Sequence, residues 1–254
     1  MVSASTESLA DQAYFAIRDE ILRGQFRPGR ALSRRRLARD LGMSVVPVTE
    51  ALQRLESDGL VESRARAGTR VRVPTERDVR ELYELREALE TQSARLFAER
   101  ATDEERLELR RLGEEVDTLF VRLAGGGDDP AFRFTVHSRH VKLHMRIAEC
   151  AGSDILRGMI ERNHVLILNW LFDVAARRSP LPADFHSRLV EDLVSGDPVR
   201  ADSAMRAHVR HGLLEITSRV SELTVSKWRE RPRHQLVRRS RDKHAAPGDA
   251  TTKV

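Results

Sequence analysis

The sequence predicts a mostly α-helical protein with two domains, and three observations support this. The chain has 254 residues, which suits two domains at roughly 100–200 residues each. From residue 76 to 225, apolar side chains recur every three or four positions, as on one face of an amphipathic helix. Strand-like segments occur only within the first 73 residues. We therefore expect a small N-terminal module with a β-hairpin, followed by an all-α helical bundle.

The N-terminal module has the element order of a winged helix-turn-helix. We expect helices over residues 9–23, 33–41 and 45–55, with a tight turn at Gly42 before the last of them. Gly59 ends that helix, and residues 60–61 and 69–73 are typical of short strands joined by a tip at 64–68. In this motif the helix after the turn enters the major groove of DNA. The sequence thus predicts a DNA-binding domain over residues 9–73 and a linker over 74–78.

Arginines gather at the two ends of this module that should face DNA. Arg34, Arg35 and Arg36 open the helix before the turn, and Arg64 and Arg66 lie at the hairpin tip. Such side chains suit contacts to phosphates or to the minor groove. A solvated surface charge explains any one of them, but their clustering favours DNA contact.

The second domain is expected over residues 79–225. Thr102, with Glu105 three residues later, predicts a capping box that divides residues 76–124 into two helices. Further helices are expected over 131–151, 154–176, 184–195 and from 196 to 225, separated by glycine and proline breaks.

Composition narrows the class of protein. No segment reaches the roughly 18 apolar residues of a spanning helix, and Cys150 is the only cysteine. The first residues have neither a basic n-region nor an apolar h-region, so we expect no secretory signal. We expect a cytoplasmic, nucleoid-associated protein with no membrane partner. The net charge of +5 divides into −1 for residues 1–8, +5 for residues 9–73, −5 for 74–224 and +6 for 225–254. Residues 226–254 are therefore expected to form a basic disordered tail, and the basic ends suit a polyanion.

The first domain carries a resemblance of about 60 residues. The motifs are Tyr14-x-x-Ile17, Ile21-Leu-Arg-Gly24, Pro28-Gly29-x-x-Leu32, Leu37-Ala38-x-x-Leu41-Gly42-Met-Ser44, Pro47-Val48-x-Glu50-Ala51-Leu52, Leu55-x-x-x-Gly59-Leu60-Val61 and Gly68-x-x-Val71. They resemble the GntR family of bacterial transcription regulators. The resemblance implies a homodimer bound to a palindromic operator in double-stranded DNA.

One part of the DNA-reading helix departs from that family. GntR proteins usually have Arg-Thr-Pro-Val-Arg where this chain has Val-Val-Pro-Val-Thr at residues 45–49. Base readout should therefore shift to polar side chains and to apolar contacts with thymine methyl groups. Together with the arginines above, the candidate DNA-contacting residues are Ser44, Pro47, Thr49, Gln53, Arg54 and Gly68.

Histidines are concentrated in the second domain. Seven of the nine lie between residues 137 and 211. His137, His140 and His144 share one helical face, and His186, His208 and His211 lie on later helices. Imidazoles brought together from neighbouring helices can bind a divalent metal, although surface or core histidines would give the same spacing.

A second resemblance covers residues 78–222. Leu85-Arg86-x-x-Leu89-Glu90, His144-x-x-Ile147-Ala148-x-x-Ala151-Gly152 and the pattern from His186 through Gly196-Asp197 to His208 resemble the FCD effector domain of the FadR branch of GntR regulators. The resemblance implies a metal held by an Asp and three His, which fall on His140, His144, His186 and His208. Histidine replaces the Asp at position 140, which favours Zn²⁺ or Ni²⁺. His137 is the rival for that fourth position.

The resemblance also implies a small organic-acid or sugar-acid effector whose carboxylate completes the metal coordination. Arg86 could bind a second carboxylate, although a salt bridge to Glu90 four residues later explains it equally well. His211 could contact the effector, and Asn163 and His164 are polar residues on a largely apolar helix that could line the pocket.

The predicted function is a ligand-responsive transcriptional regulator, and a repressor rather than an activator. One alternative is a metal-dependent hydrolase with a DNA-binding appendage, but the segment from His140 to His144 lacks the adjacent glutamate of zinc hydrolases. Another is a sequence-tolerant, nucleoid-type binder, which predicts little preference for an operator and a steep salt dependence.

Overall fold

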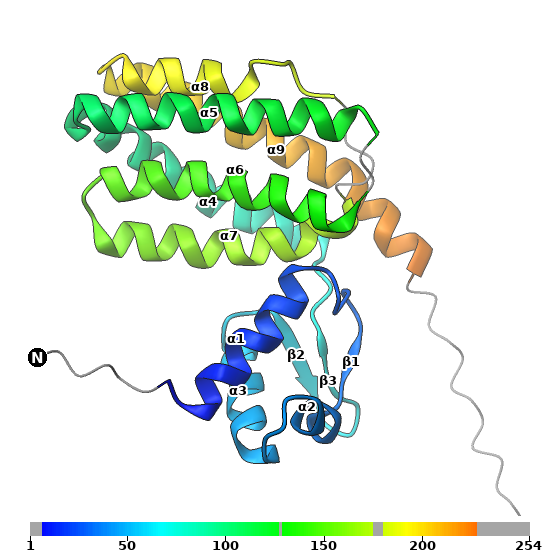
Figure 1. Ribbon diagram of the computed structural model, residues 1–254. Coiled ribbons are helices and arrows are strands. Elements are labelled where there is room, and N and C mark those ends of the chain that lie inside the picture. Colours follow the sequence, from blue (N-terminus) through cyan, green and yellow to red (C-terminus); the bar gives the residue numbers. More distant parts are fainter. Residues whose placement is uncertain (1–6, 127–128, 175–179, 228–254) are drawn as a thin grey trace, which may run out of the picture.

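The computed structural model describes residues 7–126, 129–174 and 180–227, and within them it is mostly helical, as predicted (Figure 1). The N-terminal module consists of α1 (Leu9–Leu22), β1 (Ala31–Leu32), α2 (Arg34–Asp40), α3 (Val45–Ser57), β2 (Val61–Arg64) and β3 (Gly68–Val71). The C-terminal module consists of α4 (Glu76–Arg100), α5 (Asp103–Ala124), α6 (Pro130–Cys150), α7 (Asp154–Val174), α8 (Phe185–Val194) and α9 (Pro198–Lys227). Each module has its own apolar core. The tail expected from residue 226 lies outside the described residues, except for its first two residues at the end of α9.

Short-range signals fix the helices of the N-terminal module. Ser8 and Asp11 form a reciprocal capping box at the start of α1, and the Ser33 hydroxyl caps α2 by accepting from the Arg36 amide. Gly42 joins α2 to α3 with φ of +66°, a backbone conformation that glycine adopts without steric cost. The ends of these helices and the turn between them are thus determined by residues close in sequence, which is why the sequence predicts the helix-turn-helix.

The core of this module lies between α1 and α3, which pack against each other. Ile17 and Ile21 of α1 meet Leu52 and Leu55 of α3, and each of these side chains is at most 2% exposed. At about 1.5–3 kcal/mol per fully buried side chain, this contact is the main apolar stabilisation of the reading helix.

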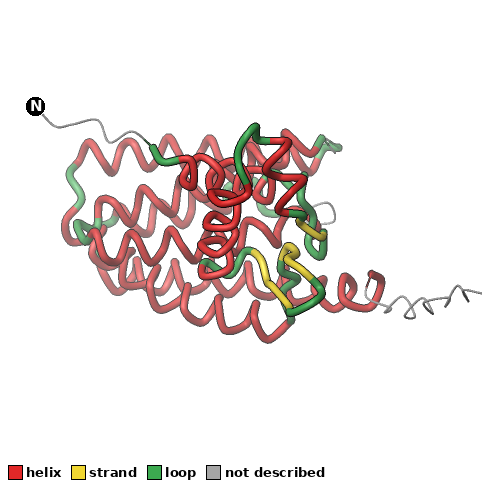
Figure 2. Tube along the Cα trace, turned by 90° about the horizontal axis from the view of Figure 1, so that it is seen from below, coloured by secondary structure: helices red, strands yellow, loops and turns green. Residues whose placement is uncertain are grey.

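The wing is a three-stranded antiparallel sheet with the order β1-β3-β2. The two predicted strands are present with shifted ends, but β1 was not predicted, because two residues give no alternating pattern. Arg64 pairs with Gly68, which leaves residues 65–67 as the tip, and Arg66 there has φ of +64°. Figure 2 shows the strands gathered in one small region of an otherwise helical trace.

The bundle begins earlier than the expected linker allows. Thr75 and Asp78 form a capping box, so α4 begins at Glu76 and takes up the last three residues of the segment 74–78. Thr102 and Glu105 cap α5 as predicted, and Asp129 caps α6 just before Pro130.

Within the bundle, α4 packs along α9, and α5 lies beside α6 and α8 (Figure 1). Gly113 of α5 permits close approach to α8, because a Cβ at this position would lie 3.0 Å from Val190 Cγ2. Side chains of α4, α6, α8 and α9 all contribute to one apolar core. None of the described helices is both long and apolar enough to cross a membrane.

Candidate functional site

The exposed start of α3 forms the candidate base-reading surface. Val46 is 65% exposed and Val45 42%, and the Ser44 hydroxyl makes no capping hydrogen bond although Ser44 is the N-cap residue. Thr49 and exposed Gln53 follow at helical spacing on the face that Val46 begins. Val45 and Val46 thus present apolar side chains at the start of the helix, where GntR proteins usually begin with an arginine. The hydroxyl groups of Ser44 and Thr49 and the amide of Gln53 flank them.

Two predicted DNA contacts lie elsewhere. Pro47 is buried in the first turn of α3 and faces the core of the module, where its missing N–H costs nothing. Arg54 is turned toward α1: it forms an ion pair with Asp11, and its guanidinium lies 4.4 Å from the centre of the Tyr14 ring. Neither side chain lies free at the surface that Ser44 and Val46 form.

The five arginines predicted to contact DNA at the two ends of the module are exposed. Arg34, Arg35 and Arg36 project from the start of α2, and Arg64 and Arg66 from the tip region of the wing. The ion pairs that two of them form are long and therefore weak: Arg36 lies 3.6 Å from Asp40, and Arg64 lies 3.8 Å from Glu62. Gly68 is also exposed and has φ of +82°, so it shapes the wing tip through its backbone.

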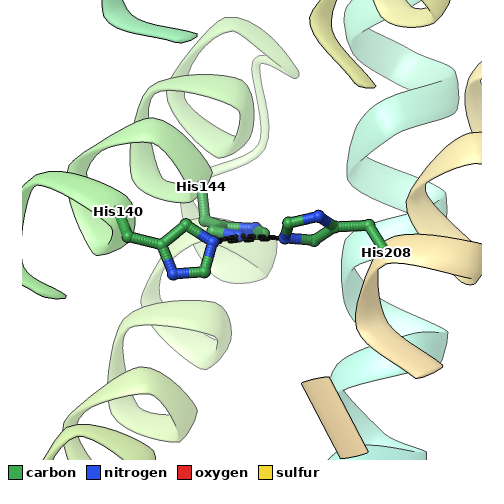
Figure 3. Close-up of side chains that lie close together, drawn as sticks. All are labelled: His140, His144 and His208. Carbon is green, nitrogen blue, oxygen red and sulfur yellow. Dashed lines mark hydrogen bonds between the residues drawn. The ribbon is translucent and has the colours of Figure 1, made fainter. Parts of the chain in front are cut away.

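Three histidines meet at the centre of the bundle, two from α6 and one from α9 (Figure 3). The Nε2 atoms of His140, His144 and His208 lie 3.0, 3.1 and 3.2 Å from one another. Nitrogens bound at about 2.0–2.1 Å to a tetrahedral metal would lie about 3.3 Å apart. The three nitrogens are therefore close to the spacing that a tetrahedral metal requires.

The electrostatics of this cluster favour neutral imidazoles. Burial lowers the pKa of His140 and of His208 well below the ordinary value, and neighbouring histidines lower both further. Burial likewise lowers the pKa of His144 to about 4, although Glu90 opposes the change. Neutral imidazoles present lone pairs, which are what a metal ion binds.

His186 borders the same cluster through its ring and is held from behind by Asp117. Its ring centre lies 4.8 Å from that of His140 and 5.5 Å from that of His208. Its Nδ1 lies 2.7 Å from Asp117 Oδ1, which favours the proton on Nδ1 and leaves Nε2 as the lone-pair nitrogen. His137 is buried nearby, but among the described residues the all-histidine group whose ligand atoms lie close enough together for a metal is His140, His144 and His208, without His137 or His186.

A buried carboxylate network lies on the other side of His144. Glu90 accepts from Arg86, contacts His144 Nδ1 and lies 3.0 Å from His164 Nε2. Burial alone would raise the pKa of Glu90, but Arg86 and the two histidines outweigh it and hold that pKa well below its usual value. Arg86 is therefore in the salt bridge that its spacing predicted, and its Nη2 also lies 3.2 Å from His144 Nε2.

His140, His186 and His208 line a cavity of about 30 Å³, enough for an ion and about one or two waters. Arg86, His164 and His211 also line it. Asn163 does not line this cavity: its Nδ2 donates to the Leu82 carbonyl, and its side chain lines a different cavity.

The sequence analysis did not predict Glu90 and Asp117 as partners of the histidines. Asp117 had one signal, because it is a charged residue beside the apolar stripe of α5 that includes Val116 and Phe120.

Comparison with known proteins agrees with both halves of the structure. The model of the bacterial regulatory proteins of the gntR family matches residues 9–71, and the FCD domain model matches residues 81–211. A probable D-xylose utilization operon transcriptional repressor of Paenarthrobacter nicotinovorans is 32% identical over 209 residues, covering 80% of this chain and 86% of that protein. The HTH-type transcriptional regulator YdhC of Bacillus subtilis is 27% identical, covering 79% of this chain and 87% of that protein.

A solved structure, E. coli McbR/YncC, is similar to this chain along most of its length. It superposes with a TM-score of 0.65 at 25% identity, covering 84% of this chain and 99% of that one. The matched families and relatives are transcriptional regulators and not enzymes, so the hydrolase alternative is set aside. The chain belongs to the GntR family, and it joins a gntR DNA-binding domain to an FCD effector domain.

Proposed function

We propose that this regulator is a homodimeric repressor whose FCD domain binds a divalent metal through His140, His144, His186 and His208. One observation supports the metal above all: the Nε2 atoms of three of these residues converge to within 3.2 Å in a buried site. His186, oriented by Asp117, supplies the fourth imidazole. A bound metal would act as a Lewis acid that attracts an anionic oxygen ligand.

The metal is proposed to be Zn²⁺ or Ni²⁺. Four neutral nitrogens suit borderline cations, whereas a carboxylate in the set would favour harder ones such as Mn²⁺. Competition with a chromophoric chelator should show tight Zn²⁺ binding by the full-length protein and a loss of at least 100-fold in His144→Ala. His234→Ala, which removes a histidine beyond the residues matched by the FCD domain model, is the matched control. His140→Asp should shift the preference toward Mn²⁺, and an unchanged metal order would contradict the role of His140.

The effector is proposed to be a small organic acid or sugar acid that binds beside the metal. Arg86 lies next to His144 and could offer a charge-assisted hydrogen bond to a carboxylate, while His211 stands at the cavity wall with its Nε2 unbonded within the described residues. Because the cavity measures only about 30 Å³, such an acid has to displace side chains, for example Phe185. Phe185 begins α8, so binding would move that helix.

Thermal unfolding with citrate and with D-gluconate, each measured with and without a chelator, tests this effector class. We expect one of these acids to raise the melting temperature of the metal-loaded protein and to lose that effect in the chelator. An acid effect that survives the chelator would contradict coordination by the metal.

Operator binding is proposed to use the exposed start of α3 for bases and the arginines of α2 and the wing for phosphates. A gel shift on the DNA upstream of its own gene, against random duplex of equal length, separates an operator-specific regulator from a nucleoid-type binder. Replacing thymine by deoxyuridine in the half-site should weaken binding, because Val46 would lose its methyl contact. Val46→Ala should reduce that difference. Equal affinity for operator and random duplex would contradict the proposal.

A further inference from the structure

A second cavity lies between the two modules, and none of its lining residues also lines the histidine cavity. It measures about 540 Å³ and is lined by side chains of α1 and α3 on one side and of α4 and α7 on the other. Pockets for small molecules usually measure about 300–1,000 Å³ and occur preferentially at domain interfaces. The size and the place are therefore those of a ligand site.

The apolar part of this cavity is exposed to an unusual degree. Phe15 of α1 is 48% exposed, Leu85 of α4 42% and Met159 of α7 39%, and all three line the cavity. The Phe15 ring also makes an edge contact with the ring of Tyr14, with centres 5.1 Å apart. Aromatic rings and a thioether favour an aromatic guest, which can take edge-to-face and sulfur contacts.

The uncompensated charge in the cavity is positive. Among the described residues, Arg18 and Arg162 have no ion-pair partner, and the Nε of Arg18 is buried without a hydrogen bond. Glu161 lies 3.7 Å from Arg157, and Asp58 accepts from the neutral Tyr14 hydroxyl at 2.6 Å, so Asp58 keeps its own negative charge. Two guanidinium groups without ion pairs therefore stand against one such carboxylate, which leaves a net positive charge for a carboxylate on the guest.

A buried amide supplies the third recognition element. Asn163 is 4% exposed and lines the cavity, and its Nδ2 donates to the Leu82 carbonyl at 3.1 Å. This bond fixes the orientation of the amide, which leaves Oδ1 without a hydrogen bond among the described residues. An unsatisfied buried acceptor costs about 1–3 kcal/mol, so a hydroxyl donor on the guest would be favoured.

We infer that the cleft between α1 and α7 is a second ligand site, distinct from the metal centre, that binds a hydroxylated aromatic carboxylate. The carboxylate pairs with Arg18 and Arg162, the aryl ring lies against Phe15 and Met159, and the hydroxyl donates to Asn163. Arg54 of α3 and Asp58, the C-cap residue of α3, also line this cleft. A guest there touches the reading helix and the effector domain together, so it biases how the two modules are oriented.

The test uses 6-hydroxy-2-naphthoate as the probe, titrated into the full-length protein and followed by its fluorescence and by calorimetry. We expect saturable binding, and binding at least ten-fold weaker for 2-naphthol, which lacks the carboxylate. Gly158→Leu should abolish binding by filling the cleft, since a Cβ there meets only the flexible end of Arg162 at 3.8 Å. Arg18→Ala should weaken it at least ten-fold. Arg188→Ala removes an arginine of α8 that pairs with Asp184 and lies outside the lining, so it is the control and should bind normally.

Chelation separates this site from the metal centre. Binding that persists in EDTA and in His144→Ala supports the cleft. Binding that disappears in either, or that is unchanged in both Gly158→Leu and Arg18→Ala, overturns the inference, as does the absence of saturation up to ~1 mM probe. The titration needs no operator DNA and no metal, so its failure would leave the proposed metal-dependent regulation untouched, and the reverse also holds.

Discussion

Replacing Asp117 by Asn should weaken metal binding and destabilise the effector domain at the same time. The carboxylate lies at the start of α8 and accepts four hydrogen bonds: from the His186 amide at 2.9 Å, His186 Nδ1 at 2.7 Å, the Ser187 amide at 2.8 Å and the Ser187 hydroxyl at 2.7 Å. Asp184, the N-cap residue of α8, makes no capping bond with its side chain. Asp117 therefore caps α8 from a neighbouring helix and also orients His186.

The magnitude follows from those contacts. An asparagine keeps one acceptor oxygen and turns its NH₂ toward donors, so at least one backbone amide is left unpaired at a buried position. A hydrogen bond to a charged group contributes about 1.5–3 kcal/mol, and the lost negative charge at a helix N-terminus about 0.3–1 kcal/mol more. We expect a loss of about 2–4 kcal/mol, or about 5–12 °C in melting temperature for a domain of this size. Metal affinity should fall about 10- to 100-fold, as when the hydrogen-bond partner of a ligand histidine is removed.

Asp184→Asn is the matched control, because it removes the same charge from the start of the same helix without touching His186. Asp184 is exposed and pairs with Arg188 at 2.7 Å, and exposed pairs contribute about 0–1 kcal/mol. Chemical denaturation in EDTA gives the stability of each variant, and chelator competition gives its Zn²⁺ affinity. If Asp117→Asn lowered stability but kept the Zn²⁺ affinity within two-fold, Asp117 would be a helix cap alone and His186 would not be a ligand.

Other expectations concern the wing, the first core and the pH dependence. Arg66→Ala should lower the slope of log affinity against log salt by about one, with operator preference kept; an unchanged slope would place Arg66 off the phosphates. Leu55→Ala should cost about 2–5 kcal/mol, because Leu55 is 0% exposed, and denaturation should show this loss in the N-terminal module with Zn²⁺ binding intact. Glu87 accepts from Arg210 and Arg206, which lower its pKa below the ordinary 4.5. Its charged form thus stabilises the contact of α4 with α9 above about pH 4.5 and less as the pH falls below that value. The destabilisation in Glu87→Gln should therefore shrink between pH 7 and pH 4, and a constant difference would argue against the ion pairs.

The helices were predictable because their signals are local. Capping residues such as Thr102, the turn at Gly42 and the three- to four-residue apolar spacing each act within one or two turns of the chain. Strand β1 escaped prediction, because its two residues pair with β3 almost 40 positions away. Such pairing leaves no periodic pattern in the sequence.

The members of the histidine cluster were predictable from the sequence, but their surroundings were not. Histidine spacing and resemblance pointed to His140, His144 and His208, which the structure brings together. The side of a helix on which Arg54 or Asn163 would lie depends on which neighbouring helix packs there. Arg54 turned to Asp11 and Asn163 to Leu82, both contacts across more than 40 residues of sequence. Only the folded arrangement decides those partners.

The position of the cluster histidines along the chain has a consequence for synthesis on the ribosome. His208 comes 68 residues after His140, whereas the N-terminal module has its own apolar core, whose last residue is Val71. Domains generally fold as units, the N-terminal one first. A nascent or truncated chain that lacks α9 would therefore display a folded α3 before the histidine cluster can form. Nonsense mutations before residue 208 should thus yield fragments that retain the N-terminal module and lack a complete histidine cluster.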